Sequence, residues 1–96
     1  MNAIYVVATN KAKEGSADKL REVLTAMIEP TRKEDGCIQY SLFADKDGKT
    51  FVFFEQWASR EALEAHTKTA HFAKLSNDAP ALLEAPSDLK ILNLIV

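Results

Sequence analysis

The chain has 96 residues, enough for one domain, and at this size folding buries only about two-thirds of the surface that the unfolded chain exposes. It is 47% hydrophobic and 27% charged, with a formal net charge of -2. That charge is too small to attract DNA, RNA or an anionic membrane over a distance. We therefore expect no nucleic acid and no membrane as partner.

The cysteine content and the hydropathy pattern narrow the class of protein further. Cys37 is the only cysteine, which excludes an intrachain disulfide and a thiolate cluster for zinc or iron–sulfur. No basic-apolar signal segment is present, and no apolar run reaches the ~20 residues that span a bilayer. The sequence predicts a soluble, cytoplasmic protein.

The first part of the chain predicts a strand and a helix. Residues 3–9 are β-branched, aromatic or small, which favours a strand. Gly15 interrupts this pattern, and Ser16 can cap a helix. The following apolar residues recur at helical spacing: Leu20, Val23, Leu24, Met27 and Ile28. They predict a helix that ends near Gly36, and Pro30 either kinks it or starts its last turn after a break.

A β-hairpin and a second helix are predicted next. Residues 37–44 and 50–57 favour strands, and the turn residues Asp47-Gly48 lie between them. Ser59 can cap the second helix. Thr69 is a candidate for restarting it.

The last part of the chain completes the topology. Asp78 precedes Ala79-Pro80 and is expected to cap a further short helix with proline in its first turn. Residues 86–88 predict a loop, and residues 89–96 a fourth strand. The order β-α-β-β-α-β predicts an α+β, ferredoxin-like fold, with an antiparallel sheet and the helices on one face. Residues 1–96 then form a single domain.

Both faces of this predicted sheet are apolar. In the third strand, Phe51 and Phe53 alternate with Val52 and Phe54, and the first and fourth strands show the same pattern. Two helices can cover only one face, and soluble monomers rarely expose a large apolar patch. We therefore expect a homodimer.

Polar and aromatic residues gather from the third strand into the second helix. The stretches are Phe54-Glu55-Gln56-Trp57, Ala62-Leu63-Glu64-Ala65-His66 and Thr69-Ala70-His71-Phe72, preceded by Glu34-Asp35-Gly36-Cys37-Ile38-Gln39-Tyr40. In this order they resemble the antibiotic biosynthesis monooxygenase (ABM) domain, in particular its small stand-alone branch of quinol-monooxygenase-like proteins. The resemblance covers nearly the whole chain and implies a dimeric α+β barrel.

The resemblance also implies a kind of chemistry. Oxygenases of this family work without a metal or flavin, so we expect no cofactor, with a small aromatic quinol and molecular oxygen as reactants. Two alternatives stay open: an isomerase of small sugar-like molecules, and a non-catalytic dimeric ligand-binding module. Heme is not expected. Heme-degrading relatives place an axial histidine near position 76 and an aromatic residue near position 66, whereas this chain has Ser76 and His66 there.

His66 and His71 are the predicted catalytic residues. His66 follows Ala62 by four positions and Leu63 by three, which places it on the apolar side of the helix. There an imidazole can act as a base near neutral pH, or it is a core histidine bonded to a backbone carbonyl. His71 lies about 140° further around an unbroken helix. It can share a pocket with His66 only if the helix breaks near Thr69, and otherwise it faces solvent or a helix end.

Six further residues are predicted to bind the substrate: Trp57, Phe72, Tyr40, Asn10, Arg32 and Glu55. Trp57 and Phe72 can hold a planar ring, and Tyr40 can donate a hydrogen bond to a quinol oxygen. Arg32 can stabilise a developing oxyanion. Glu55 lies on an aromatic strand face, where burial would raise its pKa.

The carboxylates bear on two further expectations, an alternative for Glu55 and the absence of a metal. The alternative for Glu55 is a buried ion pair with Arg32, or a bond to a backbone amide, at the dimer interface. A metal ion needs three convergent ligands, and neither Glu55 nor Glu64 matches a metalloprotease spacing with the two histidines. We therefore expect no metal.

Overall fold

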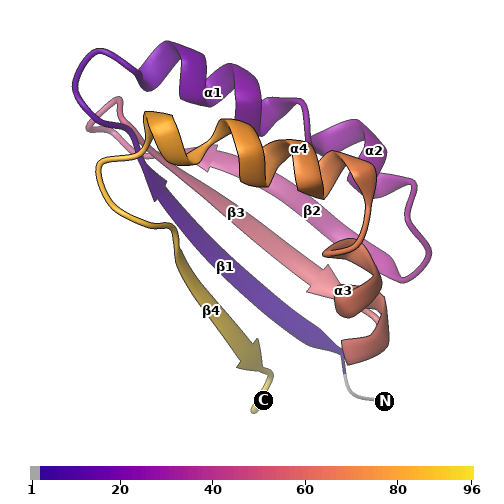
Figure 1. The fold of residues 1–96 in the computed structure, drawn as a ribbon. Helices are drawn as coiled ribbons and strands as arrows, with labels where there is room; N and C mark the ends of the chain where they lie inside the picture. Colours follow the sequence, from indigo (N-terminus) through magenta and orange to yellow (C-terminus); the bar gives the residue numbers. More distant parts are fainter. Residues whose placement is uncertain (1–2) are drawn as a thin grey trace.

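The computed structural model describes residues 3–96 as one antiparallel sheet with helices on one of its faces (Figure 1). The strands are β1 (Ile4–Lys11), β2 (Cys37–Ala44), β3 (Thr50–Trp57) and β4 (Asp88–Asn93), in the spatial order β2-β3-β1-β4. The helices are α1 (Ala17–Thr25), α2 (Ile28–Arg32), α3 (Arg60–His66) and α4 (Ala70–Asp78), and a 3₁₀ turn, η1 (Pro80–Leu82), follows α4. The predicted α+β, ferredoxin-like fold is confirmed.

The strand register decides which side chains face the helices. Val6 of β1 lies opposite Glu55 of β3 and Ile91 of β4, so these three side chains share one face. The buried residues of β1 and β3 on this face are Ile4, Val6, Ala8, Asn10, Phe51, Phe53, Glu55 and Trp57. This row forms the floor of the core.

Proline divides the first predicted helix in two. Pro30 has no N–H to donate to the carbonyl of Ala26, four residues earlier, and its ring crowds that carbonyl. The chain accordingly breaks after Thr25 and resumes as α2 at Ile28. The predicted apolar stripe still faces the sheet: Leu20, Leu24 and Met27 are buried, and Val23 and Ile28 pack against the core.

The second predicted helix also divides, at the predicted residue. Ser59 caps α3 by accepting a hydrogen bond from the N–H of Ala62, at 3.1 Å. Thr69 caps α4 in the same way by accepting from Phe72, at 3.2 Å. The chain therefore changes direction between His66 and Ala70.

Two predictions for the last quarter of the chain are wrong. Asp78 does not cap a new helix; it is the last residue of α4, where its carboxylate accepts from Lys74 at 2.9 Å. Ala79 takes the position before the proline turn instead. The fourth strand covers Asp88–Asn93 rather than residues 89–96, because it pairs with β1, which begins at Ile4, opposite Asn93.

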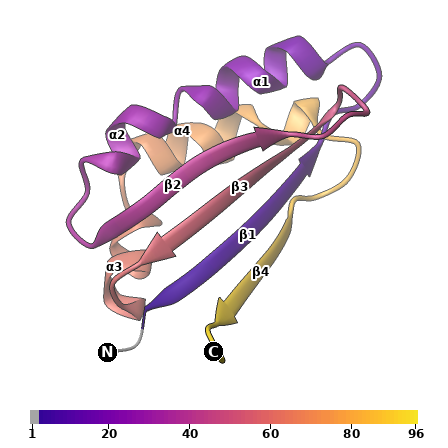
Figure 2. The same ribbon diagram turned by 180° about the vertical axis from the view of Figure 1, so that it is seen from behind.

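The face of the sheet away from the helices is bare (Figure 2). Tyr5, Val7, Val52 and Phe54 are half-buried on it, and Phe43 and Leu92 are 56% and 45% exposed. No helix within residues 3–96 has the length and apolar character that a membrane crossing needs.

Candidate active site

A cavity of about 610 Å³ lies between the helix-facing side of the sheet and the segment from α3 to β4. This volume is in the usual range for small-molecule sites. Its walls are largely apolar and include Val6, Phe53, Leu63, Leu75, Leu89 and Ile91. Leu89 and Ile91, from the edge strand β4, are 59% and 44% exposed, so the cavity opens along that edge.

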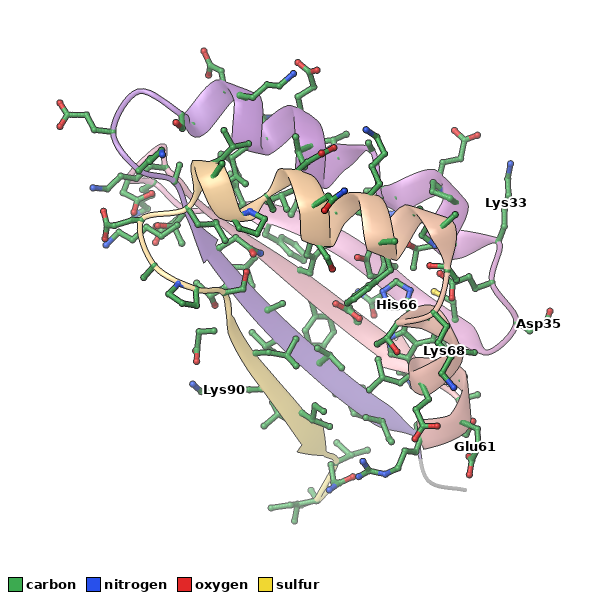
Figure 3. All side chains as sticks on the ribbon, in the orientation of Figure 1. Lys33, Asp35, Glu61, His66, Lys68 and Lys90 are labelled. Carbon is green, nitrogen blue, oxygen red and sulfur yellow. The ribbon has the colours of Figure 1, made fainter. Side chains whose placement is uncertain are left out.

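His66 is the polar residue most tightly packed at this cavity. It ends α3, is 2% exposed, and points between α4 and the sheet (Figure 3). Its ring lies 4.7 Å from that of Trp57, 5.1 Å from that of Phe72 and 5.6 Å from that of Tyr40, measured between centroids. Aromatic packing therefore holds the imidazole in one orientation.

The two nitrogens of His66 have different surroundings. Nδ1 lies 2.7 Å from Oε2 of Glu34. A carboxylate oxygen accepts hydrogen bonds, so Nδ1 carries the proton and Nε2 keeps a lone pair. Among residues 3–96, the one side-chain hydrogen bond of His66 is at Nδ1, so Nε2 is left open toward the cavity that His66 lines. Burial lowers the pKa of His66, and this effect outweighs the nearby Glu34, which raises it.

His71 approaches the same carboxylate from the other side. Its Nε2 lies 2.6 Å from Oε2 of Glu34, an approach that the break before Ala70 permits. The side chain of His71 is 22% exposed and lines a separate groove between α1 and α4, not the cavity. The two histidines thus meet at Glu34 and face different spaces.

Glu55 lies in the cavity wall and is 5% exposed. One carboxylate oxygen accepts from Nε1 of Trp57 at 2.9 Å. Burial raises the pKa of Glu55 to about 7, against the lowering effect of that hydrogen bond. Within residues 3–96, Arg32 forms no ion pair with Glu55; its Nε donates to the backbone oxygen of Tyr40, at 3.0 Å.

The other predicted ligands divide into those at the cavity and those away from it. Tyr40, Phe72 and Asn10 line it. Burial raises the pKa of Tyr40, so its phenol stays protonated. Trp57 has no exposed surface and Arg32 lies outside the cavity, so neither reaches a ligand bound there.

Asn10 lines the cavity and its side chain forms three hydrogen bonds. Its amide nitrogen donates to the backbone oxygens of Ala8 and Phe51, at 3.3 and 3.4 Å, and its side-chain oxygen accepts from the hydroxyl of Ser87. These bonds tie the segment before β4 to the end of β1.

Glu34 is the site residue that residue-by-residue reasoning missed. It lies in the bend after α2, and in the sequence it stood out only as part of the stretch that carries the family resemblance. The available signal was Gly36, two residues later, whose turn brings this loop against Ala62 of α3. With both histidines it forms the one group of side chains within residues 3–96 whose arrangement could hold a metal ion.

The family assignment follows from comparison with known proteins. Residues 3–77 match the antibiotic biosynthesis monooxygenase family, and the chain belongs to that family. The membership that the motifs predicted is thereby confirmed.

Sequence relatives cover most of the chain. Protein sll1783 of Synechocystis is 37% identical over 92% of this chain, which spans 60% of that relative's length. Rv0793 of Mycobacterium tuberculosis is 36% identical over 93% of this chain and 88% of its own length. YcnE of Bacillus subtilis is 33% identical over 90% of this chain and 92% of its own. The names of the last two class them, provisionally, as monooxygenases, which supports a monooxygenase-like role.

Solved structures confirm the fold. The structure of Rv0793 superposes with a TM-score of 0.94 at 34% identity, covering 98% of this chain and 96% of that one. PA3566 of Pseudomonas aeruginosa gives a TM-score of 0.94 at 35% identity, covering 100% and 97%.

Proposed function

We propose that this protein is a cofactor-independent monooxygenase of a small aromatic quinol, with His66 as the base. The observation that carries the proposal is the asymmetry of the His66 ring, with Nδ1 bonded to Glu34 and Nε2 left for the cavity. A positioned carboxylate sets the imidazole tautomer, as in other general-base pairs. Glu34 is therefore a positioning residue for His66.

In the proposed reaction, a quinol hydroxyl gives its proton to Nε2 of His66. The phenolate transfers one electron to molecular oxygen, which yields a semiquinone radical and superoxide. These combine at a ring carbon as a hydroperoxide, whose O–O bond breaks with loss of water. One oxygen atom stays on the ring as a hydroxyquinone, the other leaves as water, and the substrate supplies every electron.

The cavity walls suit such a substrate. Phe72 offers an aromatic face, and the neutral phenol of Tyr40 can donate to the second quinol oxygen. Glu55, in its protonated form, can donate to an oxygen that gains negative charge. The apolar surroundings strengthen each of these interactions, because they exclude water.

Oxygen uptake with a panel of quinols tests this function. The variant His66→Gln should lose roughly 100-fold to 10,000-fold in rate, the typical contribution of a positioned base. The matched variant His71→Gln should lose less, because His71 does not line the cavity. Melting temperatures establish that both variants are folded. Wild-type turnover in His66→Gln would refute the base, and isomerisation of a hydroxy-ketone without oxygen uptake would favour an isomerase.

We also propose that the protein is a homodimer through the bare face of the sheet. Half-buried and exposed apolar side chains on β1, β2, β3 and β4 support this assembly. Isolated monomers rarely leave such a surface uncovered.

Light scattering should give twice the chain mass. Phe54→Asp, on the bare face, should shift it toward the monomer. Lys68→Asp is the control, because Lys68 is an exposed residue just after α3 (Figure 3). A soluble wild-type monomer would contradict the dimer.

A further inference from the structure

Three metal-ligating side chains from separate segments converge beside the cavity. Glu34 comes from the bend after α2, His66 from the end of α3 and His71 from the first turn of α4. Their ligand atoms all lie within 4.8 Å of one another. In the sequence, Glu55 and Glu64 were the candidate carboxylate ligands beside the two histidines, whereas the fold brings in Glu34.

The three side chains of this cluster are largely buried and held in place by their neighbours. The side chains of His66, Glu34 and His71 are 3%, 12% and 22% exposed. His66 is held by three aromatic rings. His71 lines the groove between α1 and α4, which gives an ion a route that does not cross the cavity.

We propose that Glu34, His66 and His71 bind a divalent transition-metal ion, with Zn²⁺ or Co²⁺ as the ions best matched to these donors. Two imidazoles and one carboxylate are a common ligand set for such ions, with water completing a tetrahedral shell. The ion takes the place of the two protons that Glu34 now shares with the histidines.

The cluster accepts the ion after a modest rearrangement of its ligand atoms. Oε2 of Glu34 lies 2.7 and 2.6 Å from the two nitrogens. Ligand atoms around a tetrahedral ion with bonds of ~2.0–2.2 Å are separated by roughly 3.3–3.5 Å. Glu34 lies in a bend, so it can retreat by this amount. His71 is partly exposed and can turn toward His66, which brings the two imidazole nitrogens, now within 4.8 Å of each other, to the same separation while His66 stays in place.

Metal binding has a consequence that rests on the proposed function. An ion on Nδ1 of His66 takes that lone pair, so a neutral imidazole then carries its proton on Nε2. The nitrogen that faces the cavity becomes a donor and cannot accept a substrate proton. The metal-bound protein is therefore the inhibited form.

The binding test uses untagged, chelator-treated protein and needs no substrate. Titration with Co²⁺ should produce the visible absorption of a tetrahedral complex, saturating at one ion per chain, and Zn²⁺ should displace it. Glu34→Gln and His71→Ala should each weaken Zn²⁺ binding by at least about 100-fold in calorimetry. Asp35→Asn is the matched control, because Asp35 is an exposed neighbouring carboxylate that points outward (Figure 3), and it should bind as the wild type does.

The results separate the two proposals. Absence of stoichiometric binding, or binding that survives both Glu34→Gln and His71→Ala, would overturn the metal site and leave His66 as the base. With a confirmed quinol substrate, Zn²⁺ should lower the oxygen uptake of the wild type, and His71→Ala should need at least about 100-fold more Zn²⁺ for the same loss. Stoichiometric Zn²⁺ binding with unchanged turnover would keep the metal site and overturn the base.

Discussion

The two long helices on the sheet make different contacts with it. α1 buries Leu20 and Leu24 completely, and both belong to the hydrophobic core. α4 has no buried residue, and its side chains Phe72 and Leu75 line the cavity. α1 therefore packs directly on the sheet, whereas α4 lies over the cavity.

Within 96 residues, we therefore expect α1 to contribute mainly to stability and α4 mainly to the chemistry of the cavity. The close packing of α1 against the sheet stabilises the folded state. α4 packs less closely on the sheet, and His66 and Glu55 line the cavity beneath it. We expect substitutions in α1 to change the free energy of unfolding most, and substitutions along the cavity to change ligand chemistry.

Truncating matched leucines should show the largest contrast. Leu24→Ala should lower the free energy of unfolding by about 2–5 kcal/mol, because the side chain is fully buried and leaves a void. Leu75→Ala should cost under about 1 kcal/mol, because Leu75 already borders a cavity. Urea denaturation measures both values. Equal losses would mean that α4 packs as tightly as α1.

A substitution at Gly36 tests how closely the bend that carries Glu34 must approach α3. Its φ is +83°, and a Cβ there would come within 2.5 Å of the Cβ of Ala62. Gly36→Ala should cost roughly 2–4 kcal/mol from overpacking and backbone strain. Gly15→Ala shares the positive φ but has no neighbour within 4 Å, so it should cost only about 1 kcal/mol. A similar loss in both variants would show that the approach to α3 is not tight.

Glu55, in the cavity wall, should make the stability of the protein depend on pH. Its pKa is raised from 4.5 to about 7, so the folded state binds the proton more tightly than the unfolded state does. The resulting stabilisation is complete below about pH 4.5 and is lost as the pH rises through about 7, an effect on the order of 1–3 kcal/mol.

Glu55→Gln should remove this dependence, because the amide oxygen still accepts from Trp57 and cannot ionise. Urea midpoints at several pH values between about 4 and 8 measure it. Glu61→Gln, at an exposed carboxylate on α3, is the control and should keep the wild-type slope. An unchanged slope in Glu55→Gln would mean that Glu55 is ionised in the folded protein throughout this range.

The sequence by itself determined the order of elements and the inward faces. Local signals suffice for these, because periodicity, caps and turn residues act within a few positions. The stripe on α1, the cap at Ser59 and the break at Thr69 all follow from such signals. Period-two alternation likewise placed Glu55 and Trp57 on the buried strand face.

Only the tertiary structure decided how the site residues pair. Glu34 reaches His66 and His71 across 32 and 37 positions, a relation that no periodic pattern encodes. It depends on the direction of the bend after α2 and on the bare backbone of Gly36 against α3. The same holds for Trp57, whose face was predictable, while its complete burial behind His66 depends on how α3 packs on β3. Side-chain partners in loops and at helix ends are set by three-dimensional packing, and that packing placed the two histidines on one carboxylate.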